Sequence, residues 1–259
     1  HTRRPAPQAP WQTAAMPTLT LLPGLACDAT VWQDLLPSLA SQHPVFVSSA
    51  HTRHPTLPAM ATALLAEQRG PLWLAGCSMG GMLALEVWRQ APQRVRGLAL
   101  LGTSARPDTP EMVALRSQAC ALFAAGRMEE VLRANVLFAF HPLHTRPAGM
   151  VDTYLAMLRR AGATQLMAQN RAVMARVDSR PTLRTLGCSL LVACGEADQL
   201  TPPEHSREMA ALAPAAQLEI VPGAGHMLTM EQPARVGALL LDWLGRHRRA
   251  GDAAPGGTR

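Results

Sequence analysis

The chain has 259 residues, and its 24 basic against 18 acidic side chains give a formal net charge of +6. This length predicts one sizeable globular domain, and a hydrophobic content of 48% excludes a disordered chain. No run of 18 apolar residues is present, which excludes a membrane-spanning helix. All basic residues are arginines scattered along the chain, and aromatic residues make up 4%, so nucleic acid is not an expected partner.

Residues 1–15 are rich in proline, alanine, glutamine and arginine, and they precede Met16. We interpret Met16 as the natural start and residues 1–15 as a disordered extension that lacks the apolar region of a signal peptide. Residues 247–259 have the composition of a disordered tail. The five cysteines are odd in number and lack paired spacing, so we expect free thiols and a cytoplasmic protein.

Short apolar runs alternate with amphipathic segments along most of the chain. Predicted strands cover 18–22, 45–49, 72–76, 95–101, 190–194 and 217–221. Predicted helices cover 31–41, 57–68, 79–90, 203–212 and 231–246. This alternation predicts a mostly parallel six-stranded sheet with helices on both faces.

The segment 106–182 breaks the alternation because it has a helical pattern and no strand signal. Its helices are expected at 111–125, 128–139, 149–161 and 164–177. We interpret it as a helical lid inserted between two parts of a core, 16–105 and 183–246. An extra packed layer of helices is the alternative.

Gly76-Cys77-Ser78-Met79-Gly80 matches the G-x-S-x-G motif and lies between a predicted strand and a predicted helix. Such a turn lifts Ser78 above the sheet edge at a helix N-terminus, where developing negative charge is favoured. Ser78 is therefore the candidate nucleophile, whereas Cys77 is expected to point away and to have no catalytic role.

A serine hydroxyl needs a base, and His226 lies in the glycine-rich loop after the strand 217–221. Asp198, in the loop after the strand 190–194, is the best candidate to orient this histidine. Glu196 and Asp108 remain as alternative carboxylates. The backbone N–H groups of Leu25 and Met79 are the expected oxyanion hole.

These motifs, together with Pro23-Gly24-Leu25 and Gly223-Ala224-Gly225-His226, resemble the α/β-hydrolase superfamily over nearly all of 18–245. Within it the chain is similar to small capped bacterial carboxylesterases of the pimeloyl-carrier-protein methyl ester esterase type. The resemblance implies an α/β-hydrolase fold and the triad Ser78, Asp198 and His226. Pro23 stands where family members often have histidine, and the usual leading hairpin is missing.

The sequence therefore predicts a serine esterase for small to medium acyl chains that requires no cofactor and no metal. Its substrate would be a small-molecule ester, free or bound to a carrier protein, and the chain would be a monomer or dimer without a membrane partner. C–C bond hydrolysis, thioester hydrolysis and perhydrolysis by the same triad remain alternatives. A further alternative is a carrier-protein-binding module with a basic face formed by lid arginines: Arg159, Arg160, Arg171, Arg176 and Arg180.

Overall fold

The computed structural model describes residues 17–145, 149–213 and 215–252. Six strands form one parallel sheet in the order β2-β1-β3-β4-β5-β6. The strands are β1 (Thr18–Leu22), β2 (Val45–Val47), β3 (Leu72–Cys77), β4 (Val95–Leu101), β5 (Ser189–Gly195) and β6 (Ala216–Val221). All six lie where the sequence predicts them, although β2 ends two residues early.

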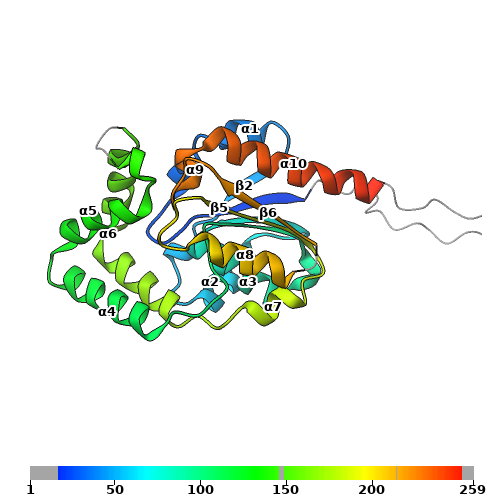
Figure 1. Cartoon of the computed structure of the whole chain (residues 1–259). Coiled ribbons are helices and arrows are strands. Elements are labelled where there is room, and N and C mark those ends of the chain that lie inside the picture. Colours follow the sequence, from blue (N-terminus) through cyan, green and yellow to red (C-terminus); the bar gives the residue numbers. More distant parts are fainter. Residues whose placement is uncertain (1–16, 146–148, 214, 253–259) are drawn as a thin grey trace, which may run out of the picture.

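Helices cover both faces of this sheet, with α1 and α10 on one face and α2, α3 and α8 on the other (Figure 1). Their bounds are α1 (Leu36–Ala40), α2 (Leu57–Glu67), α3 (Met79–Gln90), α8 (Pro203–Leu212), α9 (Leu228–Glu231) and α10 (Pro233–Asp252). Short 3₁₀ turns complete the core: η1 (Ala29–Trp32), η2 (Ala50–Thr52) and η3 (Pro92–Arg94).

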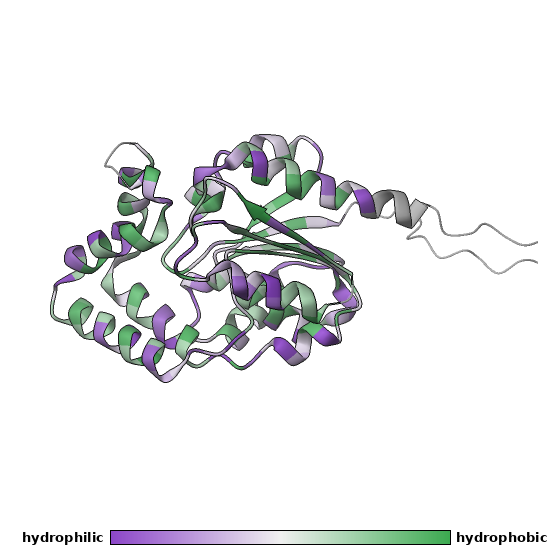
Figure 2. Cartoon of the chain, in the orientation of Figure 1, coloured by the Kyte–Doolittle hydropathy of each residue, from purple (hydrophilic) through white to green (hydrophobic). Residues whose placement is uncertain are grey.

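Alternate strand residues enter two separate apolar clusters, one on each face of the sheet. In β4, Leu98 and Leu100 pack with α2 and α3, whereas Ala99 and Leu101 pack on the opposite face. This follows from the two-residue period of a strand. The central strands β3, β4 and β5 are accordingly mostly apolar, and most of the sheet is green in Figure 2.

Between β4 and β5 the chain forms a helical insertion, and α4, α5 and α6 of this insertion lie together at one end of the molecule in Figure 1. It contains α4 (Pro110–Ala124), α5 (Met128–Ala139), η4 (Pro142–His144) and α6 (Met150–Met174), and α7 (Arg180–Arg184) leads back to the sheet. The predicted break between two helices at 161–164 is a kink within α6, where Gly162 has φ +76°.

Several predicted helix boundaries were wrong, and the predicted helix 164–177 already ends at Met174. The predicted helix 31–41 is divided into η1 and α1, and the predicted helix 231–246 begins at Pro233 after the separate turn of α9. Helix α10 continues to Asp252, so residues 247–252 are helical instead of forming the start of a tail. The predicted extension 1–15 and residues 253–259 of the predicted tail lie outside the described residues.

Candidate active site

The candidate nucleophile Ser78 occupies the turn between β3 and α3 with φ +51° and ψ −118°. Its N–H donates to the Leu101 carbonyl at 2.9 Å, and its own carbonyl accepts the Thr103 hydroxyl at 2.6 Å. These bonds tie the turn to the end of β4. In the described chain, Ser78 and Ala26 are the two non-glycine residues with positive φ, a conformation that is unfavourable for residues with a Cβ.

Close packing explains the glycines on either side of Ser78. A Cβ atom on Gly80 would lie 2.0 Å from the Leu22 carbonyl oxygen, and one on Gly76 would lie 2.3 Å from the Gly80 backbone. The first turn of α3 therefore approaches the ends of β1 and β3 more closely than any larger residue allows. This contact holds Ser78 at the carboxyl edge of the sheet.

Asp198 and His226 are in direct contact and both are buried. Nδ1 of His226 lies 2.9 Å from Oδ2 and 3.0 Å from Oδ1 of Asp198. Because a carboxylate only accepts, Nδ1 carries the proton and Nε2 is left as the acceptor. The loops after β5 and β6 thus bring together two residues that are 28 positions apart.

Thr201 completes the surroundings of the carboxylate. Its hydroxyl donates to Oδ2 at 2.9 Å, and the N–H groups of Leu200 and Thr201 each donate to Oδ1 at 2.9 Å. Burial raises the pKa of Asp198, but His226 and these donors outweigh burial and lower it below the usual value. Thr201 is not among the residues predicted for the site, although a threonine three residues after an aspartate is a recognisable turn signal.

No hydrogen bond joins the Ser78 hydroxyl to His226 within the described residues. Catalytic hydrogen bonds are often long before substrate is bound. The two residues are placed at the same edge by the parallel strands that precede them, since β3 and β6 both end there.

Of the expected oxyanion donors, Leu25 lies on the loop after β1 and Met79 is the first residue of α3. A Cβ atom on Gly24 would be 3.3 Å from the Ser78 Cβ, so the loop after β1 lies against the serine turn. Neither the Leu25 N–H nor the Met79 N–H has a hydrogen-bond partner within the described residues. Two free backbone donors beside a candidate nucleophile suit an oxyanion.

The two alternative carboxylates lie elsewhere. Glu196 is about half exposed and accepts the Gly223 N–H at 2.6 Å. Asp108 is buried between Arg116 and Arg176, with ion-pair distances of 2.8 and 2.7 Å. Neither acid contacts His226, so Asp198 is the partner that the structure provides.

Glu231, which is not among the residues predicted for the site, joins the loop that carries His226 to the helical insertion. Its buried carboxylate accepts the Gly225 N–H at 2.8 Å and the His141 N–H at 2.7 Å. It also lies 2.9 Å from Nδ1 of His144. The residue before His226 is therefore bonded to a side chain that also holds the chain segment after α5.

The predicted arginine face of the insertion does not form as a single surface. Arg176 is buried against Asp108, while Arg159 pairs with Glu129 at 2.5 Å and Arg160 with Asp28 at 2.7 Å. Arg180 pairs with Asp178 and Glu208. Arg171 has no ion pair among the described residues. Spacing in the sequence was a poor guide here because these arginines point to different neighbours.

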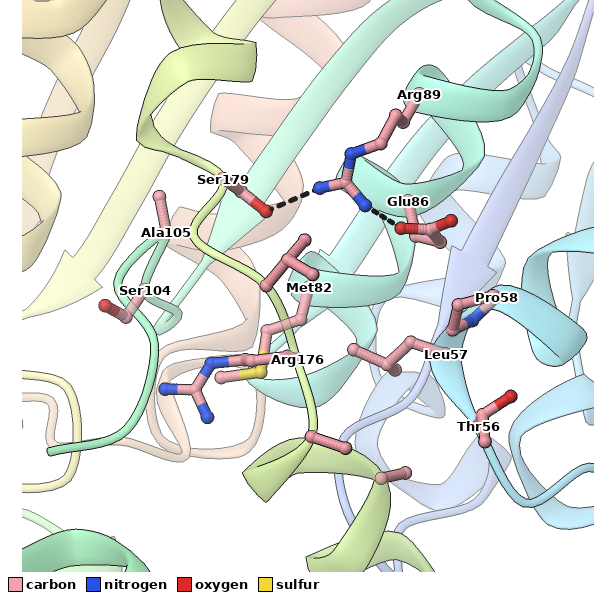
Figure 3. A pocket seen from close by; sticks show the side chains of 13 residues that line it. Thr56, Leu57, Pro58, Met82, Glu86, Arg89, Ser104, Ala105, Arg176 and Ser179 are labelled. Carbon is pink, nitrogen blue, oxygen red and sulfur yellow. Dashed lines mark hydrogen bonds and ion pairs between the residues drawn. The ribbon is translucent and has the colours of Figure 1, made fainter. Parts of the chain in front are cut away.

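A cavity of about 260 Å³ lies between α2, α3 and the segment after α6 (Figure 3). Neither Ser78 nor His226 lines it. The Arg89 guanidinium on its wall is already bound to Glu86 and, at 3.0 Å, to the Ser179 hydroxyl. We therefore do not include this cavity in the candidate site.

No helix in 17–145, 149–213 or 215–252 combines the length and apolarity that a bilayer-spanning segment needs. Across the same ranges, no three side chains among His, Cys, Asp and Glu are grouped so that they could hold a metal ion.

The fold and this arrangement of strand-end loops are those of a hydrolase built on a parallel sheet. Residues 21–239 match the model of the alpha/beta hydrolase family, and the chain belongs to that family. The predicted fold class is confirmed.

The proteins to which this chain is similar are consistent with its membership of the family. An acetoin-cleaving-system dihydrolipoyllysine acetyltransferase component from Pseudomonas putida is 30% identical over 88% of this chain, which spans 64% of that relative's length. A pimeloyl-[acyl-carrier protein] methyl ester esterase from Stenotrophomonas maltophilia is 29% identical over 88% of this chain and 93% of its own. A thermophilic esterase from Thermogutta terrifontis superposes with a TM-score of 0.80 at 26% identity, covering 90% of each chain. The names of the Stenotrophomonas and Thermogutta proteins, both esterases, agree with the predicted ester hydrolase.

Proposed function

We propose that the protein hydrolyses carboxylic esters through an acyl-enzyme formed on Ser78. The observation that carries the proposal is the buried Asp198–His226 pair at the sheet edge where strained Ser78 caps α3. A buried carboxylate that accepts Nδ1–H leaves Nε2 as a base, which is what a serine nucleophile requires. The esterase names among the relatives support the same reaction.

In the first half-reaction the Ser78 oxygen bonds to the ester carbonyl carbon, and Nε2 of His226 takes the hydroxyl proton. The carbonyl electron pair moves to oxygen, and the N–H groups of Leu25 and Met79 stabilise this oxyanion. The intermediate then expels the alcohol, which takes the proton from His226. Asp198 stabilises the imidazolium between the two transfers and keeps its own charge.

In the second half-reaction water replaces the alcohol. His226 takes a proton from water, the resulting hydroxyl group bonds to the acyl carbon, and collapse of the second oxyanion returns the proton to Ser78. The products are the free acid and the starting enzyme. Each developing oxyanion meets the same two backbone donors, each of which contributes about 3 kcal/mol to lowering the barrier in enzymes of this kind.

The helical insertion is proposed as a lid, and 106–182 as its extent. Residues beside the candidate site, Cys77 and Met227, belong to one buried apolar cluster with Tyr154 and Leu158 of α6. An acyl chain between the insertion and the sheet would therefore meet apolar side chains, which favours small to medium aliphatic acyl groups. A cytoplasmic location is part of the proposal and is supported by five free cysteines.

Carrier-bound esters are a second candidate substrate because the Stenotrophomonas relative is named for one. A comparison of free and carrier-bound esters with Arg159→Glu/Arg160→Glu tests it. A loss confined to the carrier-bound substrate supports delivery by a carrier, and equal activity toward both refutes it.

Steady-state hydrolysis of p-nitrophenyl esters from acetate to decanoate tests the main proposal. Wild type should cleave the shorter chains, and Ser78→Ala should abolish turnover. Ser104→Ala is the matched control, because this buried serine bonds the Arg106 N–H and not the candidate site. If wild type cleaves no ester, the proposal fails, and thioesters and diketones become the substrates to assay.

A further inference from the structure

The oxyanion loop contains a strained residue that is held from the helical insertion. The Cys27 N–H donates to the Gly24 carbonyl at 3.1 Å, which closes a turn with Leu25 and Ala26 at its centre. Ala26 has φ +57°, although positive φ at this place in a turn favours glycine. Unusual backbone conformations persist only where surrounding contacts hold them.

Gln169 of α6 supplies such a contact across 143 positions of sequence. Its Oε1 accepts the Ala26 N–H at 2.6 Å, and its Nε2 donates to the His51 carbonyl at 2.8 Å. The side chain is 1% exposed. Burying an amide is unfavourable unless both of its ends are bonded, and here both ends are used on backbone groups of the core.

His51 holds the next residue of the same turn. Its Nε2 lies 2.8 Å from the Cys27 carbonyl oxygen, and burial lowers the pKa of this imidazole, so Nε2–H donates from a neutral ring. The consecutive residues Ala26 and Cys27 are thus both held, Ala26 through its N–H by Gln169 and Cys27 through its carbonyl by His51, whose own carbonyl Gln169 also bonds.

We propose that Gln169 is a positioning residue through which the insertion holds the Gly24–Cys27 turn so that the Leu25 N–H faces the oxyanion. The inference rests on the proposed function of Ser78 and of this N–H. Other contacts of α6 with the loop are weaker: Arg160 reaches Asp28 at 2.7 Å, but both side chains are about half exposed. The oxyanion hole is therefore complete only while α6 lies against the core.

Gln169→Leu tests this role, and Asn170→Leu is the matched control. Asn170 is the neighbouring buried amide, but its partners are the Leu166 carbonyl and Arg116, both within the insertion. We expect Gln169→Leu to lower kcat for p-nitrophenyl butyrate by about 10- to 100-fold with KM little changed, which is less than the loss of a whole oxyanion donor. Asn170→Leu should keep kcat close to wild type.

A trifluoromethyl ketone provides a readout that a structural role would not change. The Ser78 oxygen adds to its carbonyl carbon, the hydroxyl proton passes to Nε2 of His226, and the carbonyl electron pair moves to the oxygen that occupies the oxyanion hole. Its inhibition constant should rise in Gln169→Leu by about the same factor as kcat/KM falls. Binding of the carboxylate product should not change.

Three outcomes overturn the proposal: an unchanged ketone inhibition constant in folded Gln169→Leu, an equal loss in Asn170→Leu, or a loss confined to KM. If Gln169→Leu does not fold, Gln169→Glu decides, because a carboxyl oxygen still accepts the Ala26 N–H. The proposal is supported if Gln169→Glu keeps most of the wild-type kcat while the shorter Gln169→Asn loses it. Equal losses of kcat in the two variants refute it. Failure of the proposed function is distinguished by full activity in Ser78→Ala.

Discussion

The backbone conformation of Ser78 lowers the free energy of unfolding, and replacing Ser78 with glycine should remove this strain. A residue held at φ +51° and ψ −118° is strained by about 1–3 kcal/mol. Glycine removes the strain but loses about 0.4–1 kcal/mol through the greater freedom of the unfolded chain. Ser78→Gly should therefore be more stable than Ser78→Ala, which keeps the Cβ, by about 1 kcal/mol. For a chain of this size that corresponds to a Tm difference of about 2–4 °C.

Thermal and urea unfolding of the two variants measure this difference, and neither variant retains a nucleophile that could complicate it. Ser104 provides the control because it does not have positive φ. At that position glycine should be less stable than alanine. A Ser78→Gly protein that is equal to or less stable than Ser78→Ala would refute the assignment of strain to this turn.

Three further variants separate the candidate site from its surroundings. Asp198→Asn should lower kcat by roughly 10³- to 10⁴-fold in ester hydrolysis at similar KM, because the imidazolium loses its carboxylate, and a smaller loss would contradict the triad. Since the folded pKa of Asp198 is lowered, its stabilisation is present above about pH 4 and is lost as pH falls through the folded value. Urea unfolding between pH 6 and 3 should show that the difference in the free energy of unfolding between wild type and Asp198→Asn becomes smaller as the pH falls. Asp108→Asn should lower the free energy of unfolding by about 3–5 kcal/mol, because it leaves Arg176 buried without its anion. At low temperature, where the variant stays folded, kcat should hardly change. A loss of kcat comparable to that of Asp198→Asn would make Asp108 catalytic. Cys77→Ala should keep turnover largely intact, because burial raises the pKa of this thiol and keeps it neutral, whereas loss of activity would contradict its assignment as an inert core residue.

The sheet could be predicted because its strands are short, mostly apolar runs, and the central strands β3, β4 and β5 are buried on both faces. The elbow at Ser78 could be predicted because its glycine pattern lies directly between an apolar run and a helical pattern, although the contact that requires Gly80 is with Leu22 of β1. Helix ends were less predictable, since Pro233 starts α10 two residues after the predicted start. The predicted break between 161 and 164 is present as the non-helical Gly162 within α6. Local sequence determines the first kind of feature, whereas packing determines the second.

Residues that act through distant contacts could not be found from the sequence. Gln169 contacts Ala26 across 143 positions, and Glu231 contacts His141 across 90. On the sequence each is one polar residue in a helix, and only the fold shows that its partners are backbone groups of the site loops. For the arginines of the insertion, closeness in sequence was misleading. It suggested one shared surface, but their ion pairs direct them to different neighbours.

The central claim is that Ser78 is the nucleophile and that His226 activates it. Covalent labelling with a fluorophosphonate, followed by intact-mass measurement and peptide mapping, tests both parts at once. Wild type should gain one phosphonyl group on Ser78, Ser78→Ala should gain none, and His226→Ala should react far more slowly. Modification of Cys77 or another residue, or equal labelling rates in wild type and His226→Ala, would contradict the claim.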